Sequence, residues 1–69
     1  MKEIEITTDY IKLDPFLKLD GIAQTGGQAK IMIAEGMVLV NGEVSNQRGK
    51  KIRKADVVEI KDHDKFVVV

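Results

Sequence analysis

Hydrophobic and polar residues alternate at the start of the chain and then change to a helical spacing. Residues 3–7 read Glu-Ile-Glu-Ile-Thr, and this period of two predicts a half-buried strand. Asp14-Pro15 predicts the start of a helix, because Asp14 can cap it and Pro15 suits the first helical position. We expect this helix to run to about Asp20 and to stop at Gly21.

A second helix is predicted to begin after Thr25. The sequence Thr25-Gly26-Gly27-Gln28 fits the S/T-x-x-E/Q capping box, in which hydroxyl and amide side chains satisfy free N–H groups at a helix start. Apolar residues then recur at helical spacing, and Gly36 suits the left-handed position that ends many helices. The apolar positions are Ala29, Met32 and Ile33, widened by Ile31 and Ala34.

The next apolar stretch predicts a β-hairpin. Residues 37–40 have the alternation and the valines of a strand. Asn41-Gly42 predicts a type I′ turn, because both central residues of that turn need positive φ. Val44 is then expected to begin the return strand.

Beyond a basic loop, two further strands are predicted. Ala55-Asp56 predicts a turn, and residues 57–60 resume the strand pattern. Residues 62–65 read as a polar turn, and residues 66–69 as a last short strand.

Length and composition limit what this chain can be. Its 69 residues are expected to form a single domain, residues 1–69, which buries roughly 60% of the surface of the unfolded chain. The sequence contains no cysteine, which excludes disulfides and thiolate zinc sites. No apolar run approaches the roughly 20 residues that span a bilayer, and the start of the chain is too charged for a signal peptide. We therefore expect a cytoplasmic protein with no membrane partner.

Positive charge is concentrated in one segment. The chain has 11 basic and 11 acidic residues, but residues 44–54 contain five of the basic residues and no acidic one. Charge runs are usually solvated loops, yet such asymmetry also suits a polyanionic partner, and RNA is the leading candidate for a module of this size. The five residues are Arg48, Lys50, Lys51, Arg53 and Lys54.

Side chains suited to catalysis are few. His63 is the only histidine, and it stands between Asp62 and Asp64 in a predicted turn, where neighbouring residues rarely converge on a pocket. No serine sits beside a candidate base, and no clustered acidic spacing suggests a metal site. We therefore expect no enzyme activity, no small-molecule substrate, no cofactor and no metal.

Gly26 and Gly27 have two interpretations. In the first, they only begin a helix after its N-cap. In the second, residues without Cβ leave N–H groups at a helix start open to a phosphate, although the P-loop spacing is absent. Lys18, Lys30 and the lysines of the basic loop are candidates to surround the same spot.

Aromatic residues are scarce, with only Tyr10, Phe16 and Phe66. Phe16 falls on the apolar face of the first predicted helix and is assigned to the core. Proteins that hold single-stranded nucleic acid generally need aromatic platforms. The composition therefore favours folded or double-helical RNA, contacted through phosphates and 2′-hydroxyls.

In this order the motifs resemble those of S4-type RNA-binding domains, and the chain is most similar to small free-standing members called the YaaA and YbcJ types. The match covers about residues 12–60. The string GMVLVNG at residues 36–42 fits G-x-V-x-V-N-G in full, and KLD at residues 12–14 resembles the opening R-L-D. Thr25 and Ala29 fall where the family has S-R-x-x-A.

The resemblance implies an α+β fold, the α-L motif, in which two short helices pack on a small, mostly antiparallel sheet. It also implies a bacterial, ribosome-associated type of protein that binds structured RNA, including ribosomal RNA, through phosphate contacts. We expect a monomer. The predicted RNA-binding residues are Lys12, Lys18, Thr25, Gly26, Gly27, Gln28, Lys30, Arg48, Lys50, Lys51 and Arg53.

Two departures from the family pattern matter. The family's S-R pair is Thr25-Gly26 here, so a phosphate-gripping arginine is missing and that contact shifts to backbone N–H groups and Lys30. The family's G-D before the last strand is Ala55-Asp56.

Two other classes of protein remain open. β-Grasp sulfur carriers have a similar length, an Asn-Gly turn and a similar late strand, but their chemistry needs a Gly-Gly carboxyl terminus, whereas this chain ends Phe-Val-Val-Val. A protein-docking module would use the same basic loop to meet an acidic partner.

Overall fold

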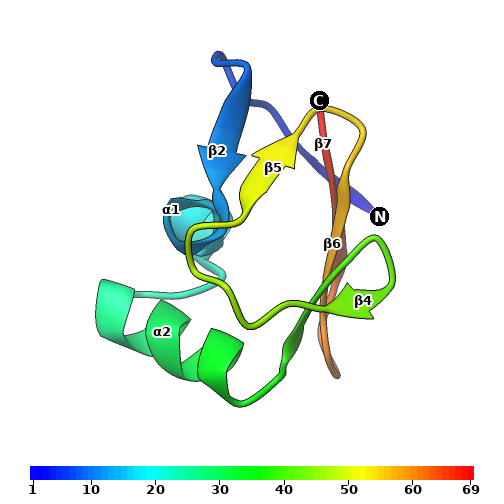
Figure 1. Ribbon diagram of the computed structural model, residues 1–69. Coiled ribbons are helices and arrows are strands. Elements are labelled where there is room, and N and C mark those ends of the chain that lie inside the picture. The colour runs from blue at the N-terminus through cyan, green and yellow to red at the C-terminus, as the bar shows by residue number, and fades with distance from the viewer.

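The computed structural model describes residues 1–69, apart from the side chain of Asp20. Helices lie beside two β-sheets in this fold (Figure 1). The helical elements are α1 (Leu13–Lys18), the 3₁₀ turn η1 (Leu19–Gly21) and α2 (Gly26–Ala34). The strands are β1 (Lys2–Ile4), β2 (Tyr10–Lys12), β3 (Val38–Val40), β4 (Glu43–Val44), β5 (Lys51–Arg53), β6 (Val57–Ile60) and β7 (Lys65–Val68).

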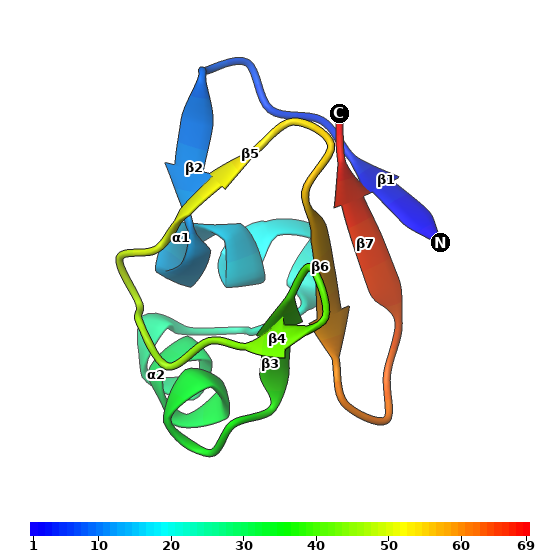
Figure 2. The same ribbon diagram turned by 45° about the vertical axis from the view of Figure 1, so that its right-hand side comes forward.

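Five strands form one sheet in the order β1-β7-β6-β3-β4, and β2 pairs with β5 in a separate ribbon. β1 runs parallel to β7, while the other pairings of the described strands are antiparallel. Both helices lie on one side of the five-stranded sheet, with the β2–β5 ribbon above α1 and with α2 below it (Figures 1 and 2). The predicted fold class, two short helices packed on a small, mostly antiparallel sheet, is confirmed.

The core lies between the helices and the inner face of the five-stranded sheet. Phe16 of α1 is fully buried and packs edge-to-face against Phe66 of β7, with the ring centroids 6.5 Å apart. Burial of each large apolar side chain contributes roughly 1.5–3 kcal/mol, so these contacts hold the helices on the sheet. The other large, fully buried residues are Leu13, Leu17, Ile33, Val38, Ile52, Val58, Ile60 and Val68.

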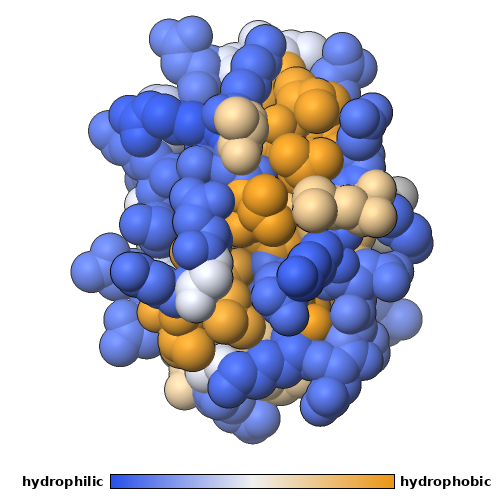
Figure 3. Space-filling model, turned by 90° about the vertical axis from the view of Figure 1, so that its right-hand side faces the viewer, coloured by the Kyte–Doolittle hydropathy of each residue, from blue (hydrophilic) through white to orange (hydrophobic). Residues whose placement is uncertain are grey.

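The outer face of the five-stranded sheet carries a group of apolar residues. Leu39 lies opposite Val44, and Val57 lies opposite Val67; Val44 is exposed and the other three are half-buried. Figure 3 views this side of the molecule, where hydrophobic side chains gather along the middle between polar ones. The face therefore differs from the β2–β5 ribbon, whose solvent side is polar.

Short-range signals in the sequence predicted the middle of the fold. Thr25 is the N-cap of α2, and its Oγ1 accepts a hydrogen bond from Gln28 N at 3.0 Å. Gln28 Oε1 accepts from Gln24 N at 2.7 Å, so the return bond of the capping box ends one residue earlier than predicted. Asn41 and Gly42 have φ of 52° and 87°, as the type I′ turn requires.

The predicted cap of the first helix is wrong. Lys12 occupies the N-cap position, and Asp14 lies inside the first turn without capping it. Pro15 is the third helical residue and not the first, as had been predicted. The loop between β4 and β5 replaces the cap, because Leu13 N donates to the Lys50 carbonyl at 2.8 Å and Asp14 N donates to the Arg48 carbonyl at 3.0 Å. A tertiary contact therefore satisfies the first two N–H groups of the helix, which have no partner within the helix itself.

Three other boundaries differ from the prediction. The first strand is Lys2–Ile4 rather than residues 3–7. The first α-helix ends at Lys18, and η1 completes the predicted span to Gly21. Part of the predicted basic loop is β5, and β2 was not predicted at all, because three-residue strands with one apolar residue each give little periodic signal.

Ala55 adopts the left-handed conformation, with φ of 78°. Left-handed backbone costs an L-residue about 1–2 kcal/mol, whereas glycine pays only its greater freedom in the unfolded chain, about 0.4–1 kcal/mol. We therefore expect Ala55→Gly to raise the free energy of unfolding by about 0.5–1 kcal/mol in urea titrations. Ala34→Gly, on the exposed side of α2, is the matched control and should lower the free energy by a similar amount. A loss of stability at both positions would contradict the left-handed turn.

Candidate nucleic-acid interface

The β2–β5 ribbon carries positive charge on its solvent face. Side chains in a strand alternate between faces, so the central pair of the ribbon points to the core and the two outer pairs share the opposite face. Ile52 is fully buried, whereas the four outer residues are exposed. The three facing pairs are Tyr10–Arg53, Ile11–Ile52 and Lys12–Lys51.

Tyr10 lies among these cations. Lys51 Nζ is 4.8 Å from the centroid of the Tyr10 ring, and Arg53 Cζ is 5.9 Å from it. Both distances fall within the range of cation–π contacts, which contribute about 0.5–1 kcal/mol at exposed sites. The ring therefore keeps two positive groups beside one another on the surface.

The charge on the ribbon has no partner among the described carboxylates. Lys12 and Lys51 face each other directly, and like charges in this arrangement destabilise a strand pair. The ion pairs between described side chains lie elsewhere, in the five-stranded sheet and its turns. An anionic ligand on the ribbon would relieve the repulsion. The two ion pairs are Lys2–Asp64, at 3.3 Å, and Lys65–Glu59, at 4.0 Å.

Backbone contacts hold the loop between β4 and β5 in place. Ser45 is buried, and its N–H donates to the Val38 carbonyl at 2.9 Å. Lys50 N donates to the Gln47 carbonyl at 3.2 Å, which closes a tight turn. The carbonyls of Arg48 and Lys50 accept the first N–H groups of α1. The loop is therefore fixed by its main chain, while the side chains of Arg48 and Lys50 are exposed.

A hydrogen-bonded pair of side chains fixes the end of β5. Asn41 Nδ2 donates to Asp56 Oδ1 at 3.0 Å, and Asn41 Oδ1 accepts from Val57 N at 2.9 Å. Asp56 Oδ2 accepts from Arg53 N at 2.8 Å. These bonds tie the β3–β4 turn to the β5–β6 turn, and they set the position of Arg53 on the ribbon.

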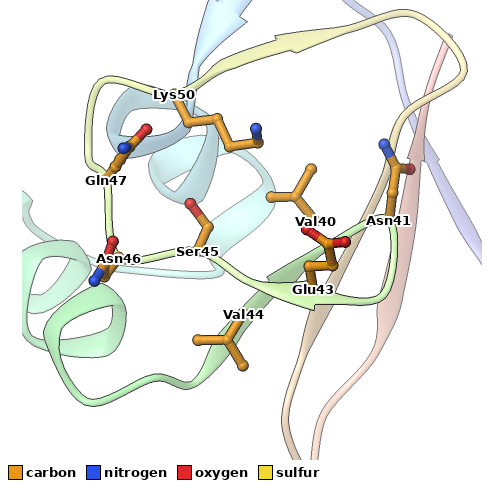
Figure 4. A pocket seen from close by; sticks show the side chains of 8 residues that line it. All are labelled: Val40, Asn41, Glu43, Val44, Ser45, Asn46, Gln47 and Lys50. Atoms are coloured by element: carbon orange, nitrogen blue, oxygen red, sulfur yellow. The ribbon is translucent and has the colours of Figure 1, made fainter.

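An open hollow of about 390 Å³ lies between the β3–β4 hairpin and the loop that leads to β5. Figure 4 shows the side chain of Lys50 extending from that loop across the hollow, toward Val40 and Asn41. The next residue, Lys51, instead directs its ammonium group to the Tyr10 ring. The side chains of these two adjacent lysines therefore lie on different parts of the surface.

The predicted site residues form two groups rather than one. Lys12, Lys51 and Arg53 meet on the ribbon, and the loop with Arg48 and Lys50 adjoins it. The second group lies on the helices, and in both ribbon views α2 is on the far side of α1 from the β2–β5 ribbon (Figures 1 and 2). The members of the second group are Lys18 at the end of α1, and Thr25, Gly26, Gly27, Gln28 and Lys30 at the start of α2.

The start of α2 is open to solvent. Gly26, Gly27 and Lys30 are exposed, and a Cβ built at Gly26 would meet no atom within 4 Å. Thr25 and Gln28 are exposed too, but their side-chain oxygens already accept backbone hydrogen bonds. Their role in the structure is therefore the capping of the helix.

Tyr10 and Ile52 are the residues of this site that the sequence analysis did not identify. Tyr10 was counted only as one of few aromatic residues, and Ile52 was placed in a loop. Both lie in three-residue strands, and the single polar-apolar-polar repeats Tyr-Ile-Lys and Lys-Ile-Arg are too short to predict a strand, although the second matches the exposed-buried-exposed order of β5.

Residues outside the ribbon were also considered as ligands. His63 is exposed in the turn between β6 and β7. Among the described side chains, no group of three His, Asp or Glu residues could hold a metal ion. No helix in residues 1–69 is long and apolar enough to cross a membrane.

Comparison with known proteins identifies the family. Residues 4–69 match the model of the S4 domain. The chain therefore belongs to the S4 domain family, which the sequence motifs had indicated. This membership does not favour the sulfur-carrier alternative.

Two relatives are similar over most of their length. The chain is 48% identical over 66 residues to the "Probable ribosome maturation protein RlbA" of Bacillus subtilis, and the match covers 96% of this chain and 93% of that protein. It is 41% identical over 59 residues to the "Putative RNA-binding protein YbcJ" of Escherichia coli, and this match covers 86% of this chain and 84% of that protein.

Solved structures show the same fold. The solution structure of E. coli YbcJ, reported to reveal an αL motif involved in RNA-binding, has a TM-score of 0.75 and 36% sequence identity. The match covers 100% of this chain and 87% of YbcJ. The 30S ribosomal protein S4e of Thermoplasma acidophilum has a TM-score of 0.69 at 22% identity, over 91% of this chain and 33% of that protein, and here the likeness is one of fold.

Proposed function

We propose that this chain is a non-catalytic, cytoplasmic protein that binds structured RNA, with ribosomal RNA as the leading candidate. The observation that carries the proposal is the solvent face of the β2–β5 ribbon, where three cations stand together without a described carboxylate partner. The names of RlbA and YbcJ, which refer to ribosome maturation and to RNA binding, support it.

Phosphate neutralisation is the proposed source of affinity. Lys12 and Lys51 would each contact one phosphate. The planar guanidinium of Arg53 suits two oxygens of a single phosphate. Arg48 and Lys50 would extend the contact along the loop. Because phosphate contacts fix the orientation of a protein but carry no sequence information, selectivity would come from the shape of the RNA.

The salt dependence of binding tests this proposal. Contact with about four phosphates releases counterions, and the slope of log K against log salt should lie near −3 to −4. Fluorescence anisotropy with a labelled, folded ribosomal RNA fragment measures that slope. A flat response between low and moderate salt would contradict phosphate neutralisation. Competition by poly-glutamate as effective as competition by RNA would instead indicate a protein-docking module.

A further inference from the structure

Tyr10 lies at the surface, whereas the other aromatic residues of the chain lie in the core. Phe16 and Phe66 are buried and pack against each other in the core. Tyr10 is the only tyrosine, and 38% of its surface is exposed on the solvent face of the β2–β5 ribbon. The ring therefore lies at the surface of the ribbon and not in the core with the two phenylalanines, and its position calls for another explanation.

The surroundings of the ring are cationic. Arg53 lies opposite Tyr10 in the register, and Lys12 and Lys51 form the next outward-facing pair. The ammonium of Lys51 and the guanidinium of Arg53 lie 4.8 and 5.9 Å from the ring centroid. An aromatic face and three positive groups therefore occupy one patch, which we call the Tyr10 patch.

These two kinds of group together fit a nucleotide better than a bare phosphate. Cations bind the phosphates on either side of a nucleotide, and an aromatic ring stacks on its base. In a continuous RNA duplex the bases are stacked on one another, so only a nucleotide displaced from the helix can offer its face to a protein ring. One ring can accept one such base.

We propose that the Tyr10 patch is a subsite for a single unpaired nucleotide, a bulge or a looped-out base, within a structured RNA. The base stacks on the Tyr10 ring, and the flanking phosphates contact Lys12, Lys51 and Arg53. The subsite rests on the proposed RNA-binding function and gives it a source of selectivity that phosphate contacts lack.

Lys51 must leave the face of the ring when the base arrives. An exposed cation–π contact is weaker than the stacking of a base on an aromatic side chain, so this exchange favours the nucleotide. The long side chain of Lys51 allows its ammonium group to move to a flanking phosphate, while Ile52 keeps the backbone of β5 anchored in the core. The free protein thus holds the Lys51 ammonium group close to the position where it would contact a flanking phosphate.

The experiment compares three RNA stems with the same base pairs: one fully paired, one with a single bulged adenosine and one with an abasic residue at the bulge. The abasic stem keeps the phosphates and the bend but removes the base. Wild-type protein should bind the adenosine bulge about 5-fold to 100-fold more tightly than the abasic bulge. Tyr10→Leu should abolish this difference, whereas Tyr10→Phe, which keeps the ring, should preserve it.

Fluorescence provides a second measurement on the unmodified protein. The chain has one tyrosine and no tryptophan, so its tyrosine emission reports on Tyr10 alone. Stacking should quench this emission with the adenosine bulge and much less with the abasic bulge. Urea titrations of both variants show whether they fold as the wild type does.

The outcomes separate the subsite from the wider function. Equal affinity of the wild type for the adenosine and abasic bulges, or discrimination that survives in Tyr10→Leu, overturns the subsite and leaves salt-dependent RNA binding intact. Failure of the wild type to bind any of the three stems at low salt overturns the proposed function and the subsite together.

Discussion

Replacing Lys12, Lys51 and Arg53 together by alanine is expected to lower the affinity for structured RNA by on the order of a hundredfold to a thousandfold at about 0.1 M salt. Removal of each phosphate-binding side chain should also reduce the salt slope by about one, so the slope of the triple variant should fall to between about 0 and −1, with Arg48 and Lys50 supplying what remains. Anisotropy titrations at several salt concentrations measure both quantities.

The same triple variant should remain folded. Loss of the two cation–π contacts with Tyr10 should lower the free energy of unfolding by about 1–2 kcal/mol, and removal of the direct opposition between Lys12 and Lys51 should return a few tenths of a kcal/mol. Weaker binding by a variant that is still folded is what distinguishes a binding surface from a structural one. A fall in stability of more than about 2 kcal/mol would contradict this account of the ribbon.

A matched control carries the same change of net charge. Lys2, Lys61 and Lys65 are exposed lysines of the five-stranded sheet and its turns. Their joint replacement by alanine should weaken binding only slightly, because long-range attraction between exposed charges is screened over about 10 Å at 0.1 M salt. Equal reductions of affinity in the two triple variants would show that net charge, and not the ribbon, determines affinity.

The sequence predicted those parts of the fold that short-range chemistry determines. The Thr25 cap and the Asn41-Gly42 turn need only residues within four positions of one another, and the structure contains both. The strands β6 and β7 were predicted as well, because each alternates buried residues over four positions. The S4-type resemblance then supplied the arrangement that local signals do not contain.

Long-range pairing was the part that the sequence did not reveal. β2 and β5 have three residues each, and only their pairing places Ile11 beside Ile52 on the core side of the ribbon. The prediction of the α1 cap was wrong for the same reason, because the first N–H groups of that helix donate to carbonyls of a loop far along the chain. The positive charge of the segment was evident from the sequence, but its alignment on one face with Tyr10 depends on the register of the ribbon.

Ile52→Ala is expected to have the largest effect on stability. Ile52 is fully buried and lies between the exposed Lys51 and Arg53, so it anchors β5 in the core. Truncation of a buried isoleucine to alanine costs about 2–5 kcal/mol. A domain of this size has a total stability of only about 3–5 kcal/mol, and the variant should therefore be partly or wholly unfolded at 25 °C. Circular dichroism and urea titrations measure the effect.

Two controls define the cause. Ile52→Val removes one methylene and should cost about 0.5–1.5 kcal/mol. Ile31→Ala makes the same truncation at an α2 residue that is 57% exposed, and it should leave stability within about 0.5 kcal/mol of the wild type. A wild-type unfolding midpoint for Ile52→Ala would show that β5 is not anchored in the core.

The response of Ile52→Ala to RNA tests the buried and the exposed residues of β5 together. Since RNA binds only the folded chain, RNA at 100 times its Kd should stabilise that chain by about 2.7 kcal/mol. That stabilisation offsets much of the cost of the truncation, so excess RNA should restore the folded signal of Ile52→Ala. The Lys12, Lys51 and Arg53 triple variant is folded without RNA and should gain little from it. Opposite responses of these two variants follow if the buried residue of β5 supports the fold while its exposed neighbours bind the ligand.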